Sequence, residues 1–126
     1  MELSDPNKVW NRAALESGGK AGLQGDRALS ALLAVHGMIM NGGVYHALEA
    51  LSAAEFADGI AGFRYFGLCE VANVLDAASI ADMGWDLFDA KYGTLIPDDG
   101  VLSQAFEQKY TAFPNAFAPL ERATPD

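Results

Sequence analysis

The chain has 126 residues, of which 51% are hydrophobic, so it can form one domain with its own core and is not a disordered segment. Its 17 acidic residues against 8 lysines and arginines give a formal net charge of −9. Such a chain repels nucleic acid and anionic lipid, which excludes both as direct partners, and any charged partner should be basic. The same charge could also serve only to keep the protein soluble.

Cysteine usage and the N-terminus bear on the cellular location. The single cysteine, Cys69, allows no intramolecular disulfide, and the N-terminus lacks the basic and apolar regions of a secretion signal. We therefore expect a cytoplasmic protein in which Cys69 is a packing residue. Residues 28–48 contain no Asp, Glu, Lys or Arg and are long enough to cross a bilayer, but a glycine pair and two histidines interrupt them. We expect two packed helices there and no membrane span.

Helix signals begin near the N-terminus and continue through the first half of the chain. Asp5, followed by a proline, predicts a helix that stops at the glycines at 18 and 19. Asp26 is expected to cap the next helix, whose apolar residues recur at helical spacing until Asn41-Gly42-Gly43 ends it. A short helix over 44–51 should follow.

The second half of the chain continues the helical pattern. Ser52-Ala53-Ala54-Glu55 is a capping box, and within the helix that follows, Gly59 and Gly62 would allow close approach of another backbone. Further helices are expected over 68–78, 81–92 and 102–113, and a tail from about residue 115 should lie extended. Because no segment alternates with period 2, we predict an all-α single domain over residues 1–126, with about six or seven short helices joined by Gly-rich turns.

Two histidines suggest a metal site, which has to be weighed against a structural role. A divalent ion could be bound by two imidazoles and two carboxylates, those of His36, His46, Glu49 and Glu70. However, His46 and Glu49 reverse the Glu-x-x-His order of di-iron bundles, and His36 lies on the apolar stripe of its helix. A hydrogen-bonded core histidine is therefore favoured. The common catalytic and nucleotide-binding motifs are absent, so we expect no catalytic residue, no metal and no cofactor.

The segment from Met40 to Glu49 is the most unusual local sequence. Its glycine pair permits a tight turn, and the helix N-terminus after the turn exposes amides that attract anions. A ligand site there would use Asn41, Gly42, Gly43, Tyr45, His46 and Glu49. The alternative is that the turn only joins two core helices. In either case one of the two glycines should have a positive φ.

Acidic residues gather in the second half of the chain. Between residues 70 and 99 there are seven acids against one lysine, Lys91. Three of these acids follow i, i+4, i+7 spacing from Asp82 to Asp89, which places them in a row on the outer side of the expected helix over 81–92. Neighbours in the row would be about 5–6 Å apart, similar to the phosphates of a DNA strand. The predicted partner-binding residues are Glu70, Asp76, Asp82, Asp86 and Asp89. A simple solvated face remains the alternative.

These segments resemble a bacterial all-helical domain family of unknown function. The resemblance covers roughly residues 28–115 and is carried by Asn41-Gly42-Gly43-Val44-Tyr45-His46, by Gly62-Phe63-Arg64-Tyr65-Phe66-Gly67 and by the helix after it. In the family an aromatic residue usually follows the Asn-Gly-Gly turn, and Tyr45 fits this loosely. The family includes a small acidic DNA-mimic protein. The resemblance implies an all-helical fold, a homodimer, and, for the DNA-mimic branch, carboxylates that occupy the DNA-binding face of a regulator.

The sequence therefore favours a non-enzymatic protein-interaction domain whose acidic face binds a basic protein partner. A DNA-binding regulator is one such partner, in which case the acidic face would act as a DNA mimic. The alternative is an enzyme or small-ligand-binding domain with a polar site at Asn41-Gly42-Gly43.

Overall fold

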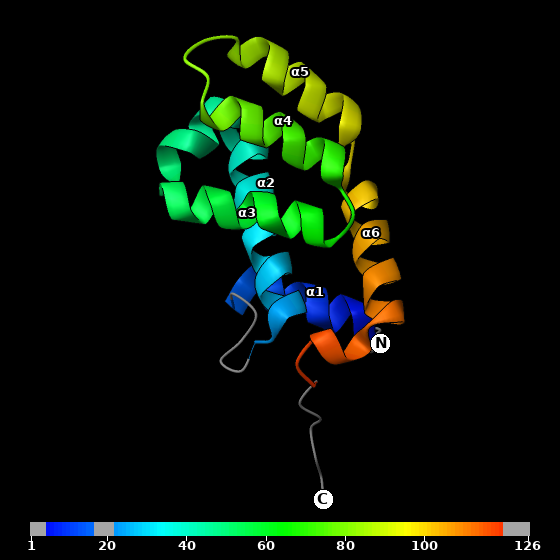
Figure 1. The fold of residues 1–126 in the computed structure, drawn as a ribbon. Helices are drawn as coiled ribbons and strands as arrows, with labels where there is room; N and C mark the ends of the chain where they lie inside the picture. Colours follow the sequence, from blue (N-terminus) through cyan, green and yellow to red (C-terminus); the bar gives the residue numbers. More distant parts are fainter. Residues whose placement is uncertain (1–4, 17–21, 120–126) are drawn as a thin grey trace, which may run out of the picture.

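The computed structural model describes residues 5–16 and 22–119, and six α-helices make up most of this part of the chain (Figure 1). No strand occurs within it, so the predicted all-α fold is confirmed. The helices are α1 (Asp5–Glu16), α2 (Gln24–Ala50), α3 (Ala53–Tyr65), α4 (Cys69–Ser79), α5 (Trp85–Leu95) and α6 (Asp99–Ala112), followed by the single 3-10 turn η1 (Pro114–Ala116).

Helix α2 is the central element of the fold. α1 and η1 lie at one end of it and α4 and α5 at the other, with α3 crossing between them and α6 running back toward α1 (Figure 1). α2 is long and apolar enough to cross a membrane by length and composition alone. Its side chains at Leu29, Leu32, Val35 and Ile39 are buried against its neighbours, so this face of α2 forms part of the core.

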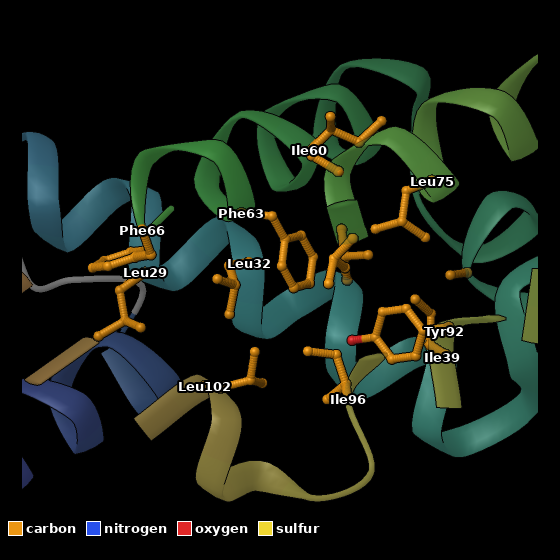
Figure 2. Packing of buried hydrophobic residues seen from close by; sticks show 14 of the residues in the cluster. Leu29, Leu32, Ile39, Ile60, Phe63, Phe66, Leu75, Tyr92, Ile96 and Leu102 are labelled. Carbon is orange, nitrogen blue, oxygen red and sulfur yellow. The ribbon is translucent and has the colours of Figure 1, made fainter. Parts of the chain in front are cut away.

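The core fills the space between α2 and the helices that surround it. Figure 2 shows Phe63 of α3, Leu75 of α4, Tyr92 of α5 and Leu102 of α6 directed into one buried cluster with the apolar residues of α2. Aromatic rings extend this cluster toward α1, where Phe106 packs against Trp10 with ring centroids 5.7 Å apart. The cluster therefore joins all six helices.

Two glycines set the distance between α2 and α3. A Cβ atom at Gly62 would overlap the backbone oxygen of Ala28, and one at Gly59 would overlap the Val35 side chain. The close backbone approach expected at these glycines is therefore confirmed. Since α3 rests on α2 through this contact, the two glycines also fix where α4 and α5 can pack.

The Asn-Gly-Gly segment kinks α2. Gly43 has φ 93° and ψ 175° and lies inside Gln24–Ala50, with helical residues on both sides. This region of backbone space is almost restricted to glycine, which confirms the prediction of a positive φ at one of the two glycines. The predicted end of one helix and start of another is thus a sharp kink without an intervening loop.

Replacing Gly43 by alanine should lower the free energy of unfolding by about 1–3 kcal/mol, because the non-glycine backbone is strained at this φ and ψ. A Cβ atom there would also lie 3.1 Å from Oδ2 of Asp89. The measurement is urea unfolding followed by circular dichroism. Gly67→Ala serves as a comparison, because Gly67 has φ 81° but no atom near its Cβ position. A Gly43→Ala variant as stable as the wild type would show that the kink does not need glycine.

Three local predictions need correction. Asp26 does not cap α2, since the helix begins at Gln24 and the Asp26 carboxylate accepts a hydrogen bond from the Leu23 N–H at 3.0 Å. Cys69 is exposed at the start of α4 and does not pack in the core. α5 begins at Trp85, later than expected, because Gly84 with φ 88° precedes it.

The segment after α6 is only partly extended. Residues 114–116 form η1, and Phe117 is buried against the rings of Phe66, Phe106 and Tyr110. Phe117 has the extended backbone that was expected from residue 115 onward, whereas residues 115 and 116 belong to η1. The part of the tail beyond residue 119 lies outside the described residues, as does the predicted helix stop at 18 and 19.

Candidate functional site

The predicted partner-binding acids are all exposed, but they do not form one row. Asp82 lies in the turn before α5, so the i, i+4, i+7 spacing does not continue along one helix. Asp86 and Asp89 lie on α5, whereas Glu70 and Asp76 lie on α4. The expected helical row of Asp82, Asp86 and Asp89 is therefore wrong, although each of its members faces solvent.

Asp89 has a structural task at the kink of α2. Its Oδ1 atom accepts a hydrogen bond from the Val44 N–H at 2.8 Å. Val44 is the first residue after Gly43, so its amide belongs to the new helix N-terminus that the sequence predicted as an anion site. The anion at that site is the protein's own carboxylate. This contact favours the structural interpretation of the Asn-Gly-Gly segment over an external ligand.

The remaining acids differ in whether their carboxylates have a hydrogen-bond or ion-pair partner. Asp76 forms a surface ion pair with Arg64 at 3.5 Å. Glu70 lines a shallow groove of about 470 Å³ between α4 and α5, beside Lys91. The side chains of Asp82 and Asp86 make no hydrogen bond or ion pair with any other residue that the structure describes. They are the two acids of the predicted set whose charge is most available.

Apolar side chains accompany these two acids. Relative exposure is 88% for Ile80, 74% for Met83 and 57% for Leu87. Large apolar side chains this exposed within eight consecutive residues are unusual for a solvated surface, and grouped ones mark interaction sites. We refer to Ile80, Asp82, Met83, Asp86 and Leu87 as the acidic corner. It comprises the turn between α4 and α5 and the first residues of α5 (Figure 1).

The predicted ligand residues separate into two groups. Gly43 faces Asp89, and the ring of half-buried His46 lies against Gly42, while Asn41 is exposed. Tyr45 and Glu49, by contrast, line a second groove on another side of α2. The structure thus does not bring the six residues together into one polar site.

The second groove is formed where four helices meet. We call it the aromatic groove, because the Tyr45 and Trp85 rings lie 5.0 Å apart at its edge. Its volume is about 560 Å³, within the range of about 300–1,000 Å³ that is usual for binding pockets. Sequence analysis missed it, because Trp85 belongs to the apolar stripe of α5 and its contact with Tyr45 depends on the kink. The other lining residues are Leu48, Glu49, Ser52, Ala53, Phe56, Ala57, Ile60, Asp76, Ala78, Ser79 and Ala81.

His36 is buried and forms polar contacts that join α2, α5 and α6, with buried Tyr92 on one side and exposed Asp99 on the other. Its Nε2 atom lies 2.9 Å from Oδ1 of Asp99, and its Nδ1 atom lies 2.7 Å from the Tyr92 hydroxyl oxygen. A carboxylate only accepts, so in the neutral ring Nε2–H donates to Asp99 and Nδ1 accepts from Tyr92. Burial, followed by the nearby Asp99 carboxylate, raises the pKa of Tyr92 well above its usual value. The hydroxyl therefore stays protonated and points into the core (Figure 2).

The favoured role of His36 as a hydrogen-bonded core residue agrees with this geometry. The metal alternative would need His46, Glu49 and Glu70 to approach it. Over residues 5–16 and 22–119 no group of three His, Cys, Asp or Glu side chains is placed to hold a metal ion. Sequence analysis missed both partners of His36, because Tyr92 and Asp99 are 56 and 63 positions away from it in the chain.

No protein-family model and no solved structure matches the chain. The resemblance to a bacterial helical family therefore stays a prediction.

Proposed function

We propose that the protein is an interaction domain that binds a basic protein partner through its α4–α5 end. The acidic corner carries this proposal. There, two exposed carboxylates without a partner among the described residues lie within the same short segment as three exposed apolar side chains. Basic side chains of a partner would meet Asp82 and Asp86, and apolar side chains would cover Ile80, Met83 and Leu87.

Physical reasons favour a basic and amphipathic partner over a purely ionic one. The net charge of −9 raises the rate at which a cationic partner arrives, since long-range attraction steers encounter. Surface ion pairs alone hold a complex weakly, at about 0–1 kcal/mol each. Burial of apolar area contributes about 25 cal/mol per Å², so the exposed apolar side chains supply the part that retains the partner.

DNA mimicry is a narrower form of this proposal. It requires the partner's binding surface for DNA to be the surface that meets Asp82 and Asp86. Only two acids of the expected row are available, so mimicry would rest on fewer phosphate-like charges than the sequence suggested. The proposal also places the protein in the cytoplasm, where basic DNA-binding regulators work.

A synthetic peptide tests the proposal without a known partner. The probe is a 14-residue amidated helix of leucine and lysine at amphipathic spacing, immobilised for surface plasmon resonance, with a leucine–glutamate peptide as its control. We expect the protein to bind the lysine peptide only, with affinity that falls as salt rises, because exposed charges are screened beyond about 8–10 Å near physiological ionic strength. Asp82→Asn with Asp86→Asn should slow association several-fold.

A matched variant controls for net charge. Asp5→Asn with Glu107→Gln removes the same two charges at α1 and at the part of α6 beside it. This variant should bind nearly as the wild type does. Equal binding by all three proteins, or equal binding of both peptides, would contradict the proposal. If the native partner is a DNA-binding regulator, duplex DNA and this protein should exclude each other from it, and simultaneous binding would rule out mimicry.

A further inference from the structure

We infer that the aromatic groove binds a lysine or arginine side chain of the partner, together with the apolar residues next to it in the partner's chain. This inference rests on the proposed function and names where the partner's cation and apolar side chains are placed. It depends on the chemistry of the groove lining rather than on the acidic corner.

The aromatic pair provides a face for a cation. Tyr45 is 46% exposed, and its ring meets that of Trp85 at 42° with centroids 5.0 Å apart. Tryptophan and tyrosine faces attract ammonium and guanidinium groups, and tryptophan does so most strongly. The two rings are in contact with each other, so the cation would lie over an outer ring face and its alkyl stem along the apolar lining beside the rings.

Two carboxylates line the same groove. Glu49 comes from the last turn of α2 and Asp76 from α4, and no basic residue lines the groove with them. Asp76 is paired with Arg64 only at 3.5 Å, and both side chains are largely exposed, so an incoming cation can replace Arg64 at little cost. The charged side chains that line the groove are therefore all negative.

The rest of the lining is apolar and takes the flanking side chains. Leu48, Phe56 and Ile60 lie in the groove with several alanines from α3 and α4. Phe56 and Ile60 are buried core residues, so this part of the groove is backed by the packed interior and is already formed. An apolar floor beneath a rim with carboxylates and aromatic rings matches an amphipathic basic segment.

The charge of a possible ligand decides whether it suits the aromatic groove. A second copy of this chain is itself acidic, with a net charge of −9, so it complements the groove poorly. An anionic metabolite is repelled by Glu49 and Asp76. The acidic corner is continuous with the groove, because Ala81 and Trp85 line the groove and lie within residues 80–87. One basic segment can therefore contact both surfaces.

The two tryptophans allow the inference to be tested in one titration. Trp85 lines the aromatic groove, whereas Trp10 belongs to α1 and packs on Phe106. α1 lies at the opposite end of α2 from α4 and α5 (Figure 1). In an NMR titration with the leucine–lysine peptide, the Trp85 indole N–H signal should shift and the Trp10 signal should not. Tyr45→Ala, and separately Glu49→Gln with Asp76→Asn, should each weaken binding by about tenfold.

The possible failures are distinguishable. Each variant is checked first by its melting curve, and the charge-matched Asp5→Asn with Glu107→Gln variant should bind as the wild type does. If the peptide binds but the Trp85 signal stays fixed, and if both groove variants bind normally, the groove inference is wrong while the proposed function stands. If the wild-type protein does not bind the peptide at all, the proposed function fails and the groove inference fails with it.

Discussion

Replacing Gly62 by alanine is expected to lower the free energy of unfolding by about 3 kcal/mol or more. The new methyl group would overlap the backbone oxygen of Ala28 and lie 3.2 Å from the Leu32 Cβ atom. A backbone oxygen within a helix cannot turn aside as a side chain can, so α3 must move away from α2. The measurement is urea unfolding by circular dichroism.

A matched alanine substitution in α2 should have the opposite effect. Gly37 is exposed, lies within α2, and has no atom within 4 Å of its Cβ position. Gly37→Ala should therefore raise the free energy of unfolding by about 0.5–1 kcal/mol, through helix propensity alone. If Gly62→Ala were as stable as Gly37→Ala, the close packing of α3 on α2 would be disproved.

Replacing Asp26 by alanine is expected to lower the free energy of unfolding by about 3–5 kcal/mol, because one partner of a buried ion pair is lost. Asp26 is fully buried, and its carboxylate accepts from the Arg12 guanidinium at 2.7 Å, the Leu23 N–H at 3.0 Å and the Ala118 N–H at 2.6 Å. The substitution would leave all three donors without this acceptor.

The loss should also release the segment after η1. Arg12 donates to the carbonyl oxygens of Ala118 and Pro119 at 3.0 and 3.3 Å, so Asp26 and Arg12 together hold this segment against α1 and α2. Hydrogen exchange at the Ala118 amide should accelerate in the variant. As a control, Asp76→Ala removes the exposed Arg64–Asp76 pair and should change stability by less than about 1 kcal/mol. Equal effects of the two substitutions would contradict a structural role for the buried pair.

Local sequence signals predicted the helices well. The Ser52–Glu55 capping box is present in the structure, with the Glu55 N–H donating to the Ser52 hydroxyl oxygen and the Ser52 N–H to the Glu55 carboxylate. Glycine positions predicted the positive φ in the Asn-Gly-Gly segment and the close approach of α3, since both depend on the absence of a Cβ atom, but the helix end expected at that segment is a kink within α2. The start of α2 was predicted at the wrong residue, because aspartate is a common N-cap residue. In the structure Asp26 is instead buried inside α2, where it pairs with Arg12 of α1.

The candidate site was harder to predict from the sequence than the fold was. The exposure of the acids was predictable from their position relative to apolar stripes. Their partners were not, because Asp89 meets Val44, and Asp99 meets His36, only after the chain folds. The aromatic groove depends on the same long-range arrangement, since the α2 kink sets where Tyr45 stands relative to Trp85.

Backbone amide mapping tests the central claim most directly. The leucine–lysine peptide is titrated into the isotopically labelled full chain, and amide shifts are followed along the sequence. Binding through the α4–α5 end predicts shifts concentrated in residues 45–60 and 76–87, with α1 unaffected. Shifts concentrated in α1 and α6, or a spectrum that the peptide does not change, would contradict the account.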